Sequence, residues 1–443
     1  MRKIVAILAC KVIRFVGKLV GKGSSLPGKI ALKIYPDVLK DINLPKNIIA
    51  VTGSNGKTST VEMIAHVLSD VGKSFAYNKE GSNQIEGVTT FILNNSTILG
   101  KFKKDIILLE TDERFAKYTF KYVKPTYYVI MNLYRDQLTR NGHPEWVYNC
   151  ILESISDDMN LILNANDPLI SMFGLERKNV SYFSVDRLNV STERCTGLYN
   201  DSKYCPNCFH PLEYEYYHYS DIGKFSCSKC GLKTNKSKFN VTQADLDQKY
   251  MVINNKYKID LAFSNMYSMY NILAAFSLLV TLGVDEKICA KGLSNYSLKN
   301  GRVVKFHIGN CKGTLLTSKH ENSVSYDQSI DIVINQKSKV DVLIIVDAVS
   351  RKYFTSEVSW LWDINFEKLN HPNVERIVLS GLYCNDLATR FDYCSIDREK
   401  IKVISSIENA VDYLKEYASN DIFVITCFSD KAKFLSKVCI DEG

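Results

Sequence analysis

The stretch NIIAVTGSNGKTST, residues 47–60, decides the fold class of this 443-residue chain. It begins with an apolar run typical of a buried strand and continues into a loop rich in glycine and small polar residues. Directly after it, apolar residues at Val61, Ile64, Ala65 and Leu68 follow the spacing of an amphipathic helix. A strand, a glycine loop and a helix in this order are typical of a phosphate-binding site, because the loop N–H groups and the helix N-terminus face the anion.

The loop carries the residue types that a nucleoside triphosphate needs. Its glycines are more closely spaced than in the standard P-loop, and Val51 stands where the distal glycine is expected. Lys57 would still meet the β- and γ-phosphate charge, and Thr58 would offer its hydroxyl to Mg²⁺. We predict an ATP site here, with a plain turn as the alternative. Its loop residues are Gly53, Asn55, Gly56, Lys57, Thr58 and Ser59.

Short apolar runs alternate with helical patterns along the chain, which predicts α/β domains built on parallel, doubly wound sheets. The runs are 105–109, 127–131, 161–163, 341–349, 374–381 and 421–428. A strong helix is expected around 270–282, and NGR at 300–302 is expected to be a hinge. We therefore predict an N-terminal helical segment at 1–45, an ATP-binding domain at 46–300 and a C-terminal Rossmann-like α/β domain at 301–443.

Carboxylates follow the predicted strand 105–109 in the string Glu110-Thr-Asp-Glu113. Open α/β sheets bind ligands at the carboxyl ends of their strands, and a hard cation that bridges phosphates needs oxygen ligands. We predict that this string helps to hold Mg²⁺. The alternative is a solvated loop of charged residues.

Four cysteines form two C-x-x-C pairs in a segment, about 199–236, whose composition differs from its surroundings. Cys205 and Cys208 are followed after 18 residues by Cys227 and Cys230, which fits a four-cysteine zinc ribbon. Since protein thiolates fill all four positions, we predict a structural Zn²⁺ that supplies folding energy to a segment too small for its own core.

The bulk composition limits the remaining possibilities. With 46% hydrophobic and 23% charged residues the chain is expected to fold, and its net charge of +8 permits an anionic partner without indicating nucleic-acid binding. The other, scattered cysteines favour a reducing, cytoplasmic compartment. Residues 1–22 predict a basic amphipathic helix that packs on the protein or touches the inner face of the cell membrane. No run reaches the roughly 18 apolar residues that span a bilayer.

The string from Val51 to Thr60 is similar to the T-G-T-N-G-K-T-T loop of Mur ligases and folylpolyglutamate synthetases. In that family ATP phosphorylates a substrate carboxylate, and an amine then attacks the acyl phosphate. Further segments that resemble Mur-ligase motifs are 132–137, 164–168 and 270–275. The resemblance implies that Glu110 helps to hold magnesium, that Asn271 contacts the adenine and that Arg302 contacts the nucleotide.

Over almost its whole length the chain resembles the MurT family, the Mur-ligase-like subunits of lipid II isoglutaminyl synthase. The features that carry this resemblance are the ATP loop, the cysteine pairs, Arg135-Asp-Gln137 and the tail string Ser359-Trp-Leu-Trp-Asp363 with Phe366-Glu367. It implies a Mur-ligase central domain with an inserted ribbon, and the cofactors ATP, Mg²⁺ and Zn²⁺. It also implies a glutamine amidotransferase partner, GatD, which supplies ammonia to amidate the D-glutamate α-carboxylate of lipid II.

Several positions depart from the pattern of this family. An aspartate two residues before the S-W pair completes the partner's Cys-His arrangement in the family, and Glu357 takes its place here. Tyr353–Thr355 replaces A-D-G, and Ser318–Ser323 departs from A-K-N-P-A-G. Two alternatives therefore stand beside the amidating synthetase. One is a free-standing amino-acid ligase of the Mur or folylpolyglutamate type, and the other is a non-catalytic nucleotide-binding paralogue in cell-wall assembly.

Overall fold

The computed structural model describes residues 1–19, 25–78, 83–262, 265–296, 303–348 and 357–441, and the chain forms two compact units. The first unit comprises Met1–Tyr134, His143–Thr196 and Asp201–Leu298. The second comprises Arg135–Gly142, Gly197–Asn200 and Lys299–Gly443. The predicted nucleotide contact Arg302 and the segment 353–355 lie outside the described residues.

A nine-stranded sheet forms the centre of the first unit, in the order β11-β10-β9-β6-β5-β4-β1-β3-β2. The strands from β2 to β9 in this order are parallel, and β10 and β11 continue the sheet antiparallel. Their bounds are β1 (Asn47–Thr52), β2 (Phe75–Tyr77), β3 (Ile106–Glu110), β4 (Tyr127–Ile130), β5 (Asn160–Asn164), β6 (Val180–Val185), β9 (Phe239–Asp245), β10 (Tyr250–Ile253) and β11 (Tyr257–Asp260). The central strands β1, β3 and β4 are buried almost throughout, which explains their continuous apolar sequence.

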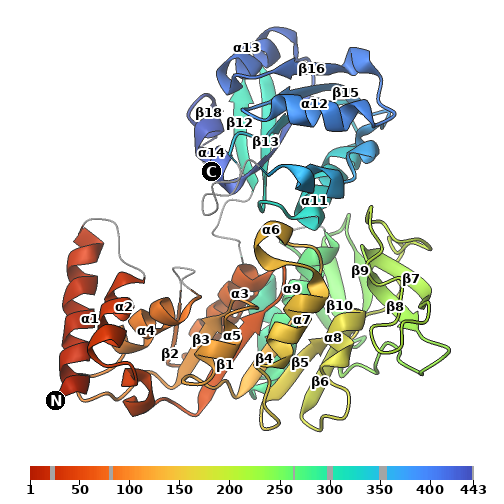
Figure 1. The fold of residues 1–443 in the computed structure, drawn as a ribbon. Coiled ribbons are helices and arrows are strands. Elements are labelled where there is room, and N and C mark those ends of the chain that lie inside the picture. Colours follow the sequence, from red (N-terminus) through yellow and green to blue (C-terminus); the bar gives the residue numbers. More distant parts are fainter. Residues whose placement is uncertain (20–24, 79–82, 263–264, 297–302, 349–356, 442–443) are drawn as a thin grey trace. The chain divides into compact units, whose positions relative to one another are not determined.

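Helices cover both faces of this sheet (Figure 1). On one face lie α3 (Lys57–Asp70), α9 (Met266–Thr281) and α10 (Glu286–Ser294), which pack against one another. On the other face lie α5 (Ala116–Thr119), α7 (Pro144–Leu152) and α8 (Pro168–Met172), around Tyr128, Leu163 and Phe173. A separate core joins β1 and β3 to α1 (Arg2–Leu19), α2 (Leu26–Ile34), η1 (Val38–Asp41) and α4 (Ile85–Asn94).

The order of β3, β1 and β4 determines where the sheet can bind a ligand. The chain leaves β1, builds β2 and β3 on one side and then adds β4 on the other, so β1 borders a topological switch point. Ligands of open α/β sheets bind in the crevice beyond the carboxyl ends of the strands at such a point. The register pairs Val51 with Glu110 and Thr52 with Ile130, so the loops after these three strands start at the same edge.

A small two-stranded module, β7 (Glu213–Tyr219) and β8 (Ile222–Ser226), interrupts the connection between the neighbouring parallel strands β6 and β9. The side chain of Asn166 ties it to the sheet. Asn166 donates to the carbonyl oxygen of Gly223 at 3.1 Å and accepts from the N–H of Val185 at 2.7 Å and the hydroxyl of Tyr270 at 2.9 Å. Because Asn166 is fully buried, these bonds satisfy its amide away from water.

A seven-stranded sheet forms the second unit, in the order β16-β15-β14-β17-β13-β12-β18. Its strands are β12 (Val303–Ile308), β13 (Cys311–Ser318), β14 (Val340–Ile345), β15 (Val374–Ser380), β16 (Ile401–Ile404), β17 (Asp421–Cys427) and β18 (Cys439–Ile440). Its helices are α6 (Leu138–Asn141), α11 (Ser323–Ile334), η2 (Ser359–Asp363), η3 (Phe366–Leu369), α12 (Cys384–Asp392), η4 (Arg398–Lys400), α13 (Ile407–Tyr417) and α14 (Phe428–Leu435). The five strands from β16 to β13 are parallel, as in a Rossmann-like sheet.

The predicted fold class is confirmed, with a parallel doubly wound sheet, an inserted cysteine-rich module and a second α/β unit. Each apolar run that the sequence predicts as a strand contains one. The largest difference is in the run 341–349, where β14 ends at Ile345 and residue 349 lies outside the described residues. Within the part of the chain that the structure describes, no helix combines the length and the apolar character that crossing a bilayer requires.

Candidate active site and metal centre

Residues 53–56 join β1 to α3 in a tight turn whose two glycines have positive φ, +142° at Gly53 and +85° at Gly56. A Cβ on Gly56 would lie 2.1 Å from Oδ1 of Asn271 and 2.6 Å from Cε of Met131. Glycine is therefore required at this position both by the backbone conformation and by the lack of space. The same closeness shows that Asn271, on α9, lies directly against the loop.

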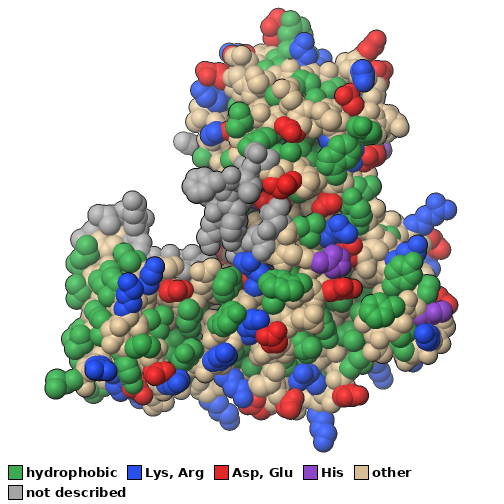
Figure 2. Space-filling view, viewed as in Figure 1, with side chains coloured by type: hydrophobic (Ala, Val, Ile, Leu, Met, Phe, Trp, Pro, Cys, Tyr) green, Lys and Arg blue, Asp and Glu red, His purple; other side chains and the backbone are tan. Residues whose placement is uncertain are grey.

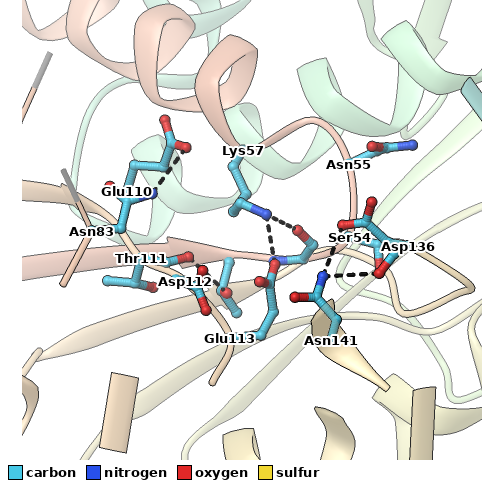
Figure 3. Close-up of polar contacts among 12 residues, drawn as sticks. Ser54, Asn55, Lys57, Asn83, Glu110, Thr111, Asp112, Glu113, Asp136 and Asn141 are labelled. Atoms are coloured by element: carbon cyan, nitrogen blue, oxygen red, sulfur yellow. Dashed lines mark hydrogen bonds and ion pairs between the residues drawn. The ribbon is translucent and has the colours of Figure 1, made fainter. Parts of the chain in front are cut away.

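Lys57 is the first residue of α3, and its side chain folds back over the loop. Its Nζ donates to the carbonyl oxygen of Gly53 at 2.5 Å and pairs with Oε1 of Glu113 at 2.6 Å (Figure 3). Glu113 also accepts from the N–H of Gly53 at 3.2 Å. Sequence reasoning singled out Glu110 and missed Glu113, although the E-x-x-E spacing of the string was a signal for it.

Thr58 and Glu110 are brought together, because the Thr58 hydroxyl donates to Oε2 of Glu110 at 2.9 Å. Two asparagines orient Glu110. Asn78 exchanges hydrogen bonds with the backbone of Glu110 at 2.8 and 3.0 Å, and Asn83 donates to its Oε1 at 3.4 Å. A hydroxyl and a carboxylate are oxygen ligands suited to Mg²⁺, so the residues fit a cation held beside the first turn of α3. Neither asparagine stood out in the sequence, since each is isolated there.

Asn132 follows β4 and clamps the phosphate loop from the neighbouring strand. Its Oδ1 accepts from the N–H of Asn55 at 2.9 Å, and its Nδ2 donates to the carbonyl oxygen of Asn55 at 3.3 Å. Its own carbonyl oxygen accepts from the N–H of Ser54 at 2.9 Å. Three hydrogen bonds therefore fix the loop backbone before any ligand arrives. Ser59, the last predicted loop residue, lies in the first turn of α3 beyond Thr58.

A second polar cluster lies in the second unit and joins two segments far apart in sequence. Asp136, which is buried, forms an ion pair with Lys319 and accepts from Nδ2 of Asn322 at 2.9 Å. Asn322 also caps α11 by accepting from the N–H of Ser325 at 2.8 Å. The string 318–323, which departs from the expected family pattern, thus keeps a lysine and an asparagine that hold the aspartate of the R-D-Q segment.

Glu357 lies just before η2, at a partly exposed position in the second unit. Its Oε1 accepts from the N–H of Ser359 at 2.7 Å, and hydrogen bonds from the side chain and backbone of Ser359 lower the pKa of its carboxyl group. Glu357 is therefore ionised at neutral pH and partly reachable from solvent. Behind it, Trp360 is buried in the core of the unit.

The four predicted zinc ligands converge on one point. The Sγ atoms of Cys205, Cys208, Cys227 and Cys230 lie within 4.8 Å of one another, and the pairs 205–230 and 208–227 are 3.5 Å apart. Tetrahedral Zn²⁺ with Zn–S bonds of about 2.3 Å would place its sulfurs about 3.8 Å apart, so the donor set fits the metal. The two turns share one geometry, since the N–H groups of Phe209 and Gly231 donate to the backbone carbonyl oxygens of Cys205 and Cys227 respectively. Phe209 and Gly231 also both have positive φ.

The ribbon has only a small apolar core of its own. Its fully buried members are Cys205, Phe225, Cys227 and Leu232, so two of the four are predicted metal ligands. The metal-ligand group found among the described residues consists of the four cysteines and does not include His210 or His218. His218 instead lies buried against Tyr216 and Tyr270, as expected for an aromatic core residue.

Two family models match the chain in the regions that contain these sites. The Mur ligase middle domain matches residues 51–203, which include the phosphate loop and the acidic string. The MurT ligase C-terminal model matches residues 320–430, which include Glu357 and most of the second sheet.

Curated relatives cover nearly the whole chain. It is 31% identical over 400 residues to the "lipid II isoglutaminyl synthase (glutamine-hydrolyzing) subunit MurT" of Staphylococcus aureus strain N315, which covers 90% of this chain and 89% of that protein. The protein of the same name from Streptococcus pneumoniae strain ATCC BAA-255 / R6 is 27% identical over 442 residues, or 98% of this chain and 96% of that one. A solved structure of a pseudomurein peptide ligase type C from Methanothermus fervidus shares the fold, with a TM-score of 0.71 at 20% identity over 91% of this chain and 79% of that one.

Proposed function

The chain belongs to the MurT family of lipid II isoglutaminyl synthase subunits, and from this premise we propose that it is the ATP-dependent ligase subunit of such a synthase. Its acceptor would be the D-glutamate α-carboxylate of lipid II, and its product the D-isoglutamine amide. The observation that supports this most strongly is the phosphate loop, held rigid by Asn132 and flanked by the Thr58–Glu110 pair at the switch point of the sheet.

The loop residues have separate tasks in ATP binding. The N-terminus of α3 faces the phosphates and stabilises their charge, because the first N–H groups of a helix have no partner within the helix. Lys57 exchanges Glu113 and the Gly53 carbonyl for the β- and γ-phosphate oxygens when ATP binds. Mg²⁺ held by Thr58 and Glu110 would neutralise charge on the phosphates during transfer. Asn271 closes the site from α9, where its side chain lies against Gly56.

The proposed reaction has two steps. A carboxylate oxygen of the acceptor attacks the γ-phosphorus, the bond from that phosphorus to the β–γ bridging oxygen breaks, and ADP leaves with an acyl phosphate formed. The nitrogen of ammonia then attacks the acyl carbon and the C–O bond to phosphate breaks. The nitrogen loses one proton as the amide forms, and the departing phosphate takes it up. Fixed positive charge and N–H groups around the transferred phosphoryl group supply most of the stabilisation.

Two further assignments accompany this proposal. The four ribbon cysteines would hold a structural Zn²⁺, because protein sulfurs occupy every corner of the tetrahedron and leave no position for a substrate. The relatives are named as subunits of a glutamine-hydrolysing enzyme, so the ammonia would come from a glutaminase partner of the GatD type. The ionised carboxylate of Glu357 would then orient the catalytic histidine of that partner. The reaction would take place in the cytoplasm at the inner face of the membrane, where a lipid-linked acceptor is presented.

The test is amidation of lipid II by the chain in complex with its glutaminase partner, with ATP, Mg²⁺ and glutamine, followed by mass spectrometry. Replacing OH by NH₂ lowers the product mass by about 1 Da, and Lys57→Ala should abolish this change. A second reaction with an ammonium salt in place of glutamine separates the ligase from its ammonia supply. Transfer of an amino acid without any partner, or no ATP-dependent product in either reaction, would contradict the proposal.

A further inference from the structure

Helix α1 has two apolar faces, and only one of them is covered. Ala6, Ile7 and Cys10 are fully buried in the core shared with α2 and α4. The opposite face carries large apolar side chains that recur every three or four residues and are exposed to solvent. They are Val5 (51% exposed), Leu8 (40%), Val12 (60%), Phe15 (67%) and Val16 (53%). Figure 2 shows apolar side chains along this helix beside lysine and arginine side chains.

The charges on α1 are all of one sign. Its sequence contains no acidic residue and five basic ones, which are Arg2, Lys3, Lys11, Arg14 and Lys18. At about 100° per residue, Arg2 and Lys11 border the exposed apolar stripe on opposite sides. Nζ of Lys11 also donates to the carbonyl oxygen of Asn94 at 3.0 Å, which holds this lysine beside the stripe. Basic residues in the first turn oppose the helix macrodipole, so Arg2 and Lys3 do not stabilise the helix where they stand. Arg2 is exposed, so its charge is available to an anionic partner outside the helix.

A second exposed apolar segment lies beside the start of α1. Leu99, in the loop after α4, is 77% exposed, and Ile98 before it is 47% exposed. A Cβ on the next residue, Gly100, would lie 3.4 Å from Cδ of Lys3, which places this loop against the first turn of α1. Lys103 adds to the positive potential there. Burial lowers the pKa of Lys11, and the nearby charge of Lys103 lowers it further.

We propose that α1 and the loop tip Ile98–Leu99 form a docking surface for an anionic membrane, with the apolar stripe inserted among the headgroups. The basic residues that border the stripe contact lipid phosphates, and the buried face of α1 keeps the catalytic unit attached to the helix. The choice of a membrane rests on the proposed function, because that acceptor is a lipid. A second copy of the chain fits less well, since it would present the same positive charges.

The experiment is sedimentation of the full-length chain, alone and in complex with its partner, with vesicles of phosphatidylcholine with or without phosphatidylglycerol. We expect binding to the anionic vesicles that weakens with added salt, because each basic residue near such a surface contributes about a fivefold factor that salt screens. Val12→Gln/Phe15→Gln should bind roughly tenfold or more weakly, because it loses the two most exposed apolar side chains of the stripe. The matched control is Leu175→Gln/Val190→Gln, which changes exposed apolar residues elsewhere in the first unit and should bind as the parent does.

Four outcomes test the docking surface and separate it from the proposed function. Weakened vesicle binding by Val12→Gln/Phe15→Gln (the stripe variant) alone, with unchanged thermal stability, supports the docking surface. No vesicle binding by the parent chain, or equal binding by both variants, overturns it. Loss of self-association or of partner binding in the stripe variant, with vesicle binding unchanged, also overturns it and assigns the stripe to a protein. Amidation of detergent-solubilised lipid II by the stripe variant keeps the proposed function intact if the docking surface fails.

Discussion

Glu113 forms an ion pair with Lys57 while also accepting a hydrogen bond from Gly53, so one carboxylate holds both the cation and the backbone of the phosphate loop. Both side chains are nearly buried, with 13% of Lys57 and 8% of Glu113 exposed. Lys57, which we propose contacts the phosphates of ATP, is thus paired with the Glu113 carboxylate in the free protein. ATP binding would exchange one anionic partner of Lys57 for another, so the lysine charge stays paired, and Glu113 would keep its hydrogen bond from the N–H of Gly53.

The first prediction concerns Glu113→Gln. This change removes the carboxylate charge that faces Lys57, so the free protein should lose about 2–3 kcal/mol of stability, as expected for breaking a largely buried ion pair. MgATP, which supplies the missing negative charge, should then raise the melting temperature more than it does in the parent chain. Thermal unfolding with and without MgATP measures both effects. An equal rise in the two proteins would show that Glu113 does not compete for Lys57.

The second prediction concerns the clamp on the phosphate loop. Asn132→Ala removes two hydrogen bonds to Asn55 and should weaken MgATP binding up to about thirtyfold, since each bond contributes about 1 kcal/mol. Isothermal titration calorimetry gives the affinity. The control is Asn160→Ala, which removes a comparable amide bond to Thr126 at the opposite end of the sheet and should leave ATP affinity unchanged. Equal losses in the two variants would point to general destabilisation.

The phosphate loop and its contacts show how much of the structure the sequence predicts. The loop and its flanking strand and helix were predictable, because their signals lie within about twenty consecutive residues. Thr58 and Glu110 could be predicted as partners because the carboxyl ends of parallel strands meet at one edge. The clamp by Asn132 and the contact of Asn271 with Gly56 depend on how β4 and α9 pack against the loop, which local patterns do not contain. The contacts of Asp136 with Lys319 and Asn322 likewise join residues that are 183 and 186 positions apart.

The third prediction concerns the ribbon. The purified chain should contain one zinc atom, and Cys230→Ser should lose it, because three thiolates hold Zn²⁺ much less tightly than four. Elemental analysis by mass spectrometry and thermal unfolding are the measurements. Cys439→Ser changes another exposed cysteine, outside the cluster, and should keep both the metal and the melting temperature. Full zinc content in Cys230→Ser would exclude the four-cysteine site.

The fourth prediction concerns the pH dependence of stability. Burial lowers the pKa of His218 from 6.5 to about 4, against the opposing effect of its hydrogen bond with the Val185 carbonyl oxygen. The unfolded chain therefore binds a proton at a higher pH than the folded one does. The contribution of His218 to stability is complete above pH 6.5 and falls by about 3 kcal/mol as the pH is lowered toward 4. His218→Gln should flatten the fall in unfolding free energy between pH 6.5 and 5, and an unchanged slope would refute the assignment.

The fifth prediction concerns coupling to the glutaminase. In the complex, Glu357→Gln should lower glutamine-driven amidation about a hundredfold or more, because a carboxylate that orients a catalytic histidine cannot be replaced by an amide. Amidation driven by an ammonium salt should be unchanged, and Glu357→Asp should restore part of the glutamine-driven rate. The control Glu375→Gln changes another exposed acidic residue of the second unit. Loss of both activities in Glu357→Gln would instead indicate damage to the ligase itself.

We propose that the loop between β1 and α3 positions ATP to phosphorylate a carboxylate of the acceptor. The most direct measurement uses lipid II labelled with ¹⁸O in the D-glutamate α-carboxylate and follows the label during amidation by the complex. If an acyl phosphate forms, one labelled carboxylate oxygen leaves with the inorganic phosphate when ammonia displaces it. We expect this transfer of label to phosphate. Amide formed with unlabelled phosphate would contradict it.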